Sequence, residues 1–219
     1  MQLHPKTIYQ WVLADARQGG TLYLSLIRHH KRRRKQRRCS RRRIFADRIS
    51  IHDRPNIVAD KVRFGDWESD TMEGGKSKGG LATHTEIKSR YLVDGKLTDK
   101  RSATFMQASI ALFNDIPPAL IKTFTVDNGS EFAQFKSLEK ATNSQVYFAD
   151  PHSPWQRGLN ENTNGLLRRY FPKGCNFHPI SATVIQAVID NLNHRPRKCL
   201  NFRTPYEVFF KTKTVALGT

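Results

Sequence analysis

The sequence predicts a mixed α/β fold whose sheet begins near residue 61. Three segments, over residues 61–72, 81–88 and 91–97, combine β-branched and aromatic side chains and follow one another as the strands of a meander do. A helical pattern over 102–114 and a fourth strand-like segment over 121–126 come next. Antiparallel strands followed by a helix and a further strand are typical of a layered α/β domain.

Local signals set the limits of the other predicted elements. Residues 6–17 carry apolar side chains at helical spacing, a pair of glycines ends that pattern, and Thr21 can cap a second short helix. Residues 73–80, rich in glycine, form a turn between two strands. The remaining predicted helices are 154–170, 181–193 and a short one that begins with a capping box from Thr204 to Glu207.

Positive charge is concentrated in the first quarter of the chain. The 219 residues hold 37 Lys and Arg against 19 Asp and Glu, a net charge of +18, and residues 1–60 contribute 15 basic and 4 acidic side chains. A basic run over 31–43, which includes Arg32, Arg33 and Arg34, repels itself too strongly to fold alone. Such a run suits a solvated tail as well as a nucleic-acid contact. The overall charge favours a polyanionic partner, because Lys and Arg release counterions from phosphate backbones.

Composition excludes several other classes of protein. Cys39, Cys175 and Cys199 are widely spaced and have no partners at zinc-site spacing, so we expect reduced thiols in a cytoplasmic protein. No apolar stretch approaches the roughly 20 residues that a membrane span needs, and the first residues lack the apolar core of a signal peptide. The sequence therefore predicts neither membrane insertion nor export.

Three carboxylates stand in contexts that suit a shared site. Asp70 ends a run in which acids recur at every second residue, so a strand would turn them to one face. Asp127 directly follows an alternating strand, at the kind of strand end where ligands of α/β sheets usually bind. Glu161 lies in a predicted helix, on the side that it shares with Asn164 and Arg168.

Phosphodiester cleavage is the chemistry that would use these acids. In a protein that holds polyanions, clustered carboxylates would repel phosphate unless divalent cations lay between them. Two Mg²⁺ ions about 3.5 to 4 Å apart need several hard oxygen ligands from separate elements. Each acid taken alone is more commonly a turn, capping or exposed helical residue, so the three gain meaning only together.

Each of the three acids lies inside a longer motif. The motifs are Gly65-x-Trp67-Glu68-x-Asp70, Thr125-Val126-Asp127-Asn128-Gly129-Ser130-Glu131-Phe132 and Ser153-Pro154-Trp155-Gln156-Arg157-Gly158-Leu159-Asn160-Glu161-Asn162, followed by Tyr170-Phe171-Pro172-Lys173-Gly174 and Thr204-Pro205-Tyr206-Glu207-Val208-Phe209. Between Asp127 and Glu161 lie 33 residues. Together these motifs and this spacing resemble the insertion-sequence-thirty family of bacterial transposases, which belong to the DDE type.

The resemblance implies a ribonuclease-H-like, integrase-like mixed sheet flanked by helices and preceded by a small basic helical segment. It implies that Asp70, Asp127 and Glu161 are the catalytic and metal-binding triad, with Asp70 bridging two Mg²⁺ ions, or Mn²⁺ in their place. The implied reaction is DNA strand cleavage and strand transfer during transposition of an insertion sequence. The implied partners are double-stranded DNA, from transposon ends and target, and further copies of the chain in a homo-oligomer.

Other polar residues of these motifs are expected to contact DNA. The expected contacts come from basic and amide side chains near the third acid and from the basic run, namely Arg157, Asn160, Asn164, Arg168, Lys173, Arg32, Arg33 and Arg34. Trp67 and Trp155 are expected to be core aromatics rather than platforms for base stacking. Glu68 is a candidate supporting acid beside Asp70.

The beginning of the chain leaves a second interpretation open. Residues 4–12 resemble the interior of a helix-turn-helix and open late relative to family members. We therefore expect an N-terminally truncated transposase, with a remnant helix-turn-helix and basic linker over 1–58 and the catalytic domain over 59–219. The alternative is a non-catalytic DNA-binding remnant of a truncated transposase, and a plain ribonuclease-H-type nuclease is a weaker third.

Overall fold

The computed structural model describes residues 4–25 and 47–211, and the chain divides into one unit over 1–43 and another over 44–219. The first unit contains α1 (Pro5–Arg17) and a 3-10 turn, η1 (Leu22–Ser25), where a short helix after Thr21 is predicted. The ring of His4 starts α1 by accepting a hydrogen bond from the backbone N–H of Lys6. The basic run, with Arg32, Arg33 and Arg34, lies outside the described residues.

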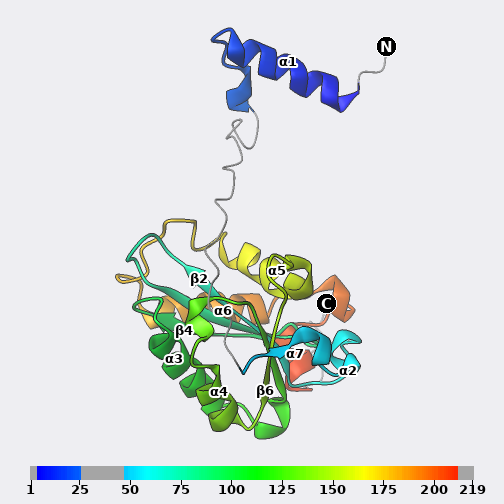
Figure 1. Cartoon of the computed structure of the whole chain (residues 1–219), viewed down its shortest axis with the longest axis vertical. Coiled ribbons are helices and arrows are strands. Elements are labelled where there is room, and N and C mark those ends of the chain that lie inside the picture. Colours follow the sequence, from blue (N-terminus) through cyan, green and yellow to red (C-terminus); the bar gives the residue numbers. More distant parts are fainter. Residues whose placement is uncertain (1–3, 26–46, 212–219) are drawn as a thin grey trace, which may run out of the picture. The chain divides into compact units, whose positions relative to one another are not determined.

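A six-stranded mixed sheet forms the centre of the second unit (Figure 1). Its strands are β1 (Ile49–Ser50), β2 (Asp66–Glu73), β3 (Gly80–Glu86), β4 (Leu92–Leu97), β5 (Thr123–Val126) and β6 (Gln145–Phe148), in the order β1-β6-β5-β2-β3-β4. β2, β3 and β4 are antiparallel, whereas β5 runs parallel to β2, β6 to β5 and β1 to β6. This arrangement confirms the predicted ribonuclease-H-like mixed sheet and its meander.

Helices cover both faces of this sheet. They are α2 (Asn56–Ala59), α3 (Ser102–Asn114), α4 (Phe135–Thr142), α5 (Gly158–Leu167), α6 (Ala182–Asn193) and α7 (Pro205–Phe209), with 3-10 turns η2 (Ile51–Asp53), η3 (Pro118–Leu120), η4 (Ser130–Phe132), η5 (Pro154–Arg157) and η6 (Lys198–Leu200). α3 has the predicted limits. α5 is shorter than predicted, because η5 takes the residues before Gly158. The predicted capping box is confirmed: Glu207 N–H donates to Thr204 Oγ1, and Thr204 N–H donates to Glu207 Oε2.

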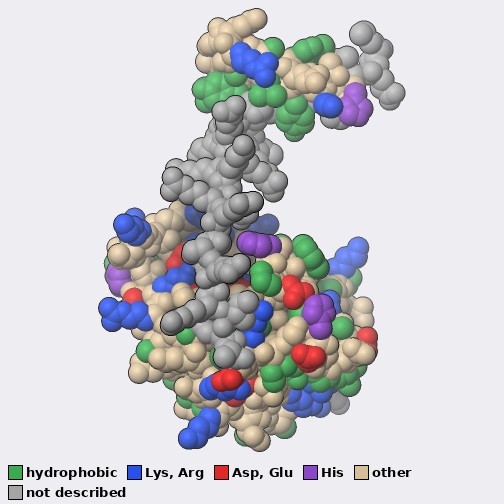
Figure 2. Space-filling model, in the orientation of Figure 1, with side chains coloured by type: hydrophobic (Ala, Val, Ile, Leu, Met, Phe, Trp, Pro, Cys, Tyr) green, Lys and Arg blue, Asp and Glu red, His purple; other side chains and the backbone are tan. Residues whose placement is uncertain are grey.

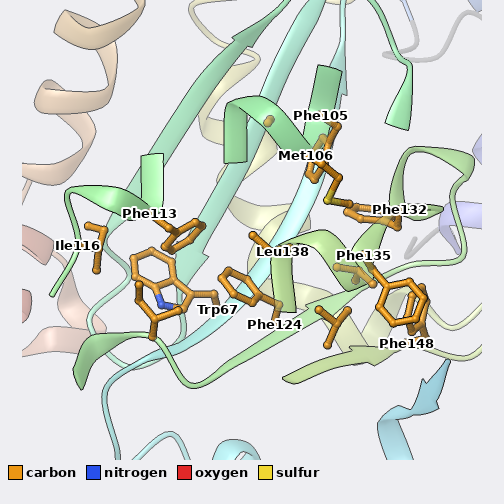
Figure 3. Packing of buried hydrophobic residues seen from close by; sticks show 14 of the residues in the cluster. Trp67, Phe105, Met106, Phe113, Ile116, Phe124, Phe132, Phe135, Leu138 and Phe148 are labelled. Atoms are coloured by element: carbon orange, nitrogen blue, oxygen red, sulfur yellow. The ribbon is translucent and has the colours of Figure 1, made fainter. Parts of the chain in front are cut away.

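The larger hydrophobic core lies between the sheet and the helices α3 and α4 (Figure 3). Trp67, on β2, is fully buried there and meets Phe113 edge to face, with ring centroids 5.0 Å apart. Its indole Nε1 donates to the carbonyl of Leu120 at 2.9 Å, so the polar end of the ring is satisfied. Trp67 is therefore the core aromatic that its sequence context predicts.

The opposite face of β2 carries the acids. Because side chains alternate along a strand, Asp66, Glu68 and Asp70 turn away from the face that holds Trp67. α5 and α6 cover this second face over a smaller core that includes Met72, Leu81, Leu167 and Ile189. The fold thus places an acidic row under α5. None of the described helices has both the length and the apolar character that crossing a bilayer requires.

Candidate active site

The sheet brings Asp70 and Asp127 together. β2 and β5 are parallel neighbours, with Glu68 opposite Thr125, so continuing this register by two residues places Asp70 beside Asp127. A turn fixes Asp127, since the backbone N–H of Gly129 donates to its Oδ1 at 2.7 Å. The Asn128 side chain holds the same turn by donating to the carbonyl of Ala149 at 2.6 Å.

One guanidinium lies between these two carboxylates. Nη2 of Arg157 is 3.8 Å from Asp70 Oδ1 and 3.4 Å from Asp127 Oδ2. Its Nη1 donates to the carbonyl of Ser69 at 2.8 Å, which anchors the side chain beside β2. Arg157 ends η5, immediately before α5, so the start of that helix is tied to both acids. The place between Asp70 and Asp127 therefore holds a positive charge.

Asp70 is the more enclosed of the two acids. Asn164 Nδ2 donates to its Oδ2 at 2.9 Å, and the backbone N–H of Thr71 donates to its Oδ1 at 2.8 Å. Burial raises the pKa of the Asp70 carboxyl, and the charge of Asp127 adds to this rise, while Arg157 opposes it. A carboxylate in this position gains from any cation placed against it.

Glu161 lies on α5 with an exposed side chain, three residues before Asn164. The helix that carries it is held against the site by the contact between Asn164 and Asp70. Over the described ranges, no group of three or more His, Cys, Asp and Glu side chains is close enough to hold a metal ion. The structure thus brings two of the three predicted acids together and leaves the third at the surface of the adjoining helix.

Two further residues of the site have no role in the sequence prediction. Glu131 is buried next to Asp127: a Cβ added to Gly129 would lie 2.5 Å from Glu131 Oε2 and 2.8 Å from Asp127 Oδ1. Lys100 Nζ is 3.6 Å from Glu131 Oε1 and 2.9 Å from Glu73 Oε1. Burial raises the pKa of Glu131, and the charges of Asp127 and Asp70 act in the same direction. The four-residue interval between Asp127 and Glu131, across a turn, is the signal that could have identified Glu131.

The residues expected to contact DNA lie in different settings. Asn160 is only 1% exposed, and its backbone N–H donates to Glu68 Oε2 at 3.0 Å, so its side chain faces the interior. Arg168 is partly buried and donates to the carbonyl of Glu73 at 2.6 Å. Lys173 is exposed. Their roles in DNA binding stay predictions.

Trp155 corrects the expectation that it belongs to the core. Its side chain is 75% exposed, in the 3-10 turn before α5. The sequence prediction was wrong because η5 leaves the indole at the surface, outside both hydrophobic cores. A large aromatic ring is thus left on the surface, two residues before Arg157.

Basic side chains are spread over the surface of the second unit. Figure 2 shows Lys and Arg on its visible face, with acidic side chains interspersed among them. The positive charge on this face is thus distributed rather than gathered into one continuous patch.

Comparison with known proteins gives a consistent result, although no protein-family model matches the chain. The chain is 37% identical over 205 residues to a transposase for insertion sequence element IS4351 of Bacteroides fragilis, covering 93% of the chain and 63% of that relative. It is 38% identical over 208 residues to a transposase for IS1086 of Cupriavidus metallidurans, covering 93% of the chain and 61% of that relative. It is 37% identical over 216 residues to the transposase InsI for IS30A of Escherichia coli K12, covering 95% of the chain and 56% of that relative.

These alignments extend through both units and include all the motifs around the three acids. The chain spans about three fifths of the length of the relatives that it matches. Over more than nine tenths of its length, the chain is therefore similar to transposases of insertion sequences.

Proposed function

We propose that this chain cleaves and joins DNA strands during transposition, with Asp70, Asp127 and Glu161 as the residues that hold two divalent metal ions. The observation that carries the proposal is the meeting of Asp70 and Asp127 around a single positive charge, next to the helix that bears Glu161. The names of the relatives support a role in transposition.

The donor set fits Mg²⁺ or Mn²⁺. Asp70 and Asp127 offer carboxylate oxygens, which are the hard ligands that these ions prefer. The guanidinium of Arg157 already occupies the space between them, so this space suits a cation. Asp70 would hold both ions, Asp127 one of them and Glu161 the other, once the Glu161 side chain turns toward Asp70.

Bound metal ions would supply the charge that activates the attacking oxygen and stabilises the departing one. The chain's own residues would prepare the geometry for this step. Asn164 holds Asp70 in one orientation by its hydrogen bond at 2.9 Å. Arg157 would move from the carboxylates to a DNA phosphate when the metal ions bind. Arg168 would contact a further phosphate from the same helix.

We propose further that two or more copies act together in the cytoplasm on double-stranded DNA, because transposition requires two transposon ends to be held at once. The net charge of +18 supports an affinity for DNA that falls as salt rises.

The test is nicking of a supercoiled plasmid in the presence of Mg²⁺. We expect Asp127→Asn to abolish nicking and to keep salt-sensitive DNA binding, since the substitution removes a metal ligand without changing the shape of the side chain. Asp115→Asn, an equivalent change at the exposed end of α3, is the matched control and is expected to cut as the unaltered chain does. Metal-dependent nicking by Asp127→Asn would overturn the proposal. An unaltered chain that binds DNA without cutting it would instead favour the non-catalytic alternative.

A further inference from the structure

A cavity lies on the other side of α5 from Asn164. It has a volume of about 510 Å³, which is in the range of small-molecule sites. Residues from several elements form its walls, among them Arg54, Lys61, Glu68, Arg90, Trp155 and Arg197. None of the residues to which the proposed chemistry is assigned belongs to this wall.

The walls of the cavity are strongly positive. Its charged lining residues are one acid, Glu68, and four basic residues, Arg54, Lys61, Arg90 and Arg197. One nitrogen of Arg54 already has a hydrogen-bond partner, since its Nη1 donates to Thr125 Oγ1 at 2.7 Å. Within the described part of the chain, Nε of Arg197 is buried without a hydrogen-bond partner. The cavity thus has more positive charge than its own residues neutralise, which suits an anionic ligand.

An aromatic ring forms one wall of the same cavity. Trp155 is 75% exposed, although a side chain of this size usually contributes to packing. The turn that presents it is held in place, because Gln156 Nε2 donates to Asp150 Oδ2 at 2.9 Å and Asp150 N–H donates to Gln156 Oε1 at 2.7 Å. A fixed, solvent-exposed indole beside guanidinium groups is the combination that binds nucleic-acid bases by stacking and their phosphates by charge.

The cavity adjoins the candidate active site through β2 and α5. Glu68 lines the cavity and lies two residues from Asp70 on the same face of β2, a separation of about 7 Å along a strand. Gln156 and Gly158, which also line it, flank Arg157 in the sequence. A ligand here would therefore lie about one nucleotide away from a phosphate held at Asp70.

We propose that this cavity binds one unpaired nucleotide of a DNA strand next to the phosphate that is cleaved. Its base stacks on Trp155 and its phosphate lies among Arg54, Arg90 and Arg197. The inference takes the position of the cleaved phosphate from the proposed function. It concerns DNA binding alone and does not require that the chain cleave DNA.

The test compares two fluorescent hairpin duplexes, one with a blunt end and one with three unpaired thymidines, by anisotropy in EDTA. We expect the unaltered chain to bind the thymidine-tailed duplex more tightly. Trp155→Ala should lower affinity for the tailed duplex by about 5- to 150-fold, the range for loss of one stacked base, and leave the blunt duplex nearly unchanged. Trp155→Phe should restore most of the preference. Arg90→Ala should weaken binding to the tailed duplex more than binding to the blunt duplex.

Lys140→Ala is the charge-matched control, because it removes one positive charge from α4 on the opposite face of the sheet. It should change both affinities equally. Trp155 is exposed, so thermal unfolding of Trp155→Ala should match that of the unaltered chain. Equal affinity of the unaltered chain for the two duplexes, or an unchanged ratio in Trp155→Ala, would overturn the inference. Metal is absent and no strand is cut, so the outcome is independent of the nicking experiment.

Discussion

Asp94 should make the folded chain less stable as pH rises toward 7. This β4 residue lies opposite Thr83, is 8% exposed, and has an Oδ2 that makes no hydrogen bond to any described residue. Burial, with a further contribution from the charge of Asp190 on α6, raises the pKa of Asp94 to about 7 from its ordinary 3.8. Lys96, on the same face of the strand, does not offset this because its Nζ donates to the carbonyls of His178 and Ile180.

The size of the effect follows from linkage. The folded state keeps the proton of Asp94 to a higher pH than the unfolded state does, so the stabilisation from this group is complete below pH 4 and is lost as pH rises to about 7. A shift of about three pKa units, at about 1.4 kcal/mol each, gives a loss of about 4 kcal/mol. Asp94→Asn keeps the neutral form at every pH. The free energies of unfolding of the two proteins should meet near pH 4 and differ by up to about 4 kcal/mol above pH 7, with the variant more stable.

Urea denaturation followed by tryptophan fluorescence, repeated from pH 4 to pH 8.5, measures this difference directly. Other buried acids contribute equally to both proteins, so the comparison isolates Asp94. Two curves that stay parallel across this range, or a variant that is less stable at pH 8, would refute the reasoning.

Three further substitutions test the core, a helix start and the candidate active site. Trp67→Ala should lower the free energy of unfolding by about 3–5 kcal/mol, because the indole is fully buried. The control Trp11→Ala, at a 56% exposed position, should change the free energy of unfolding by less than about 0.5 kcal/mol. Equal effects of the two substitutions in urea denaturation would be inconsistent with the packing. Thr204→Ala should cost about 1 kcal/mol by removing the capping hydrogen bond to Glu207, and a neutral result in the same assay would show that the cap contributes nothing. Arg157→Ala should tighten Mn²⁺ binding several-fold, because it removes the positive charge that competes with the metal for Asp70 and Asp127. The electron paramagnetic resonance of free Mn²⁺ measures this binding, and weaker binding by the variant would contradict the reasoning.

The sequence predicted those parts of the fold that local patterns determine. α3 and the capping box at Thr204 follow from helical spacing and capping chemistry, and both have the expected limits. β1 has two residues and β6 has four, and both join the sheet only through partners distant in the chain, so no local pattern identifies them. The acidic face of β2 was predictable from alternation along a strand.

The proximity of Asp70 and Asp127 was predictable from their strand contexts, but the residues that surround them were not. The position of Arg157 between Asp70 and Asp127 depends on how η5 packs against β2, which residue spacing does not reveal. Glu131 could have been identified by its four-residue interval from Asp127, although its burial depends on the Gly129 turn. Trp155 was misplaced because size and apolarity predict burial only where a neighbouring layer exists to cover the ring.

Mn²⁺ binding to the DNA-bound chain tests the central claim most directly. We expect electron paramagnetic resonance to show two Mn²⁺ ions per active site in the unaltered chain. Asp70→Asn should lose both, whereas Asp127→Asn and Glu161→Gln should each lose one. Unchanged Mn²⁺ occupancy in Asp70→Asn would contradict the assignment of Asp70, Asp127 and Glu161 as the catalytic metal site.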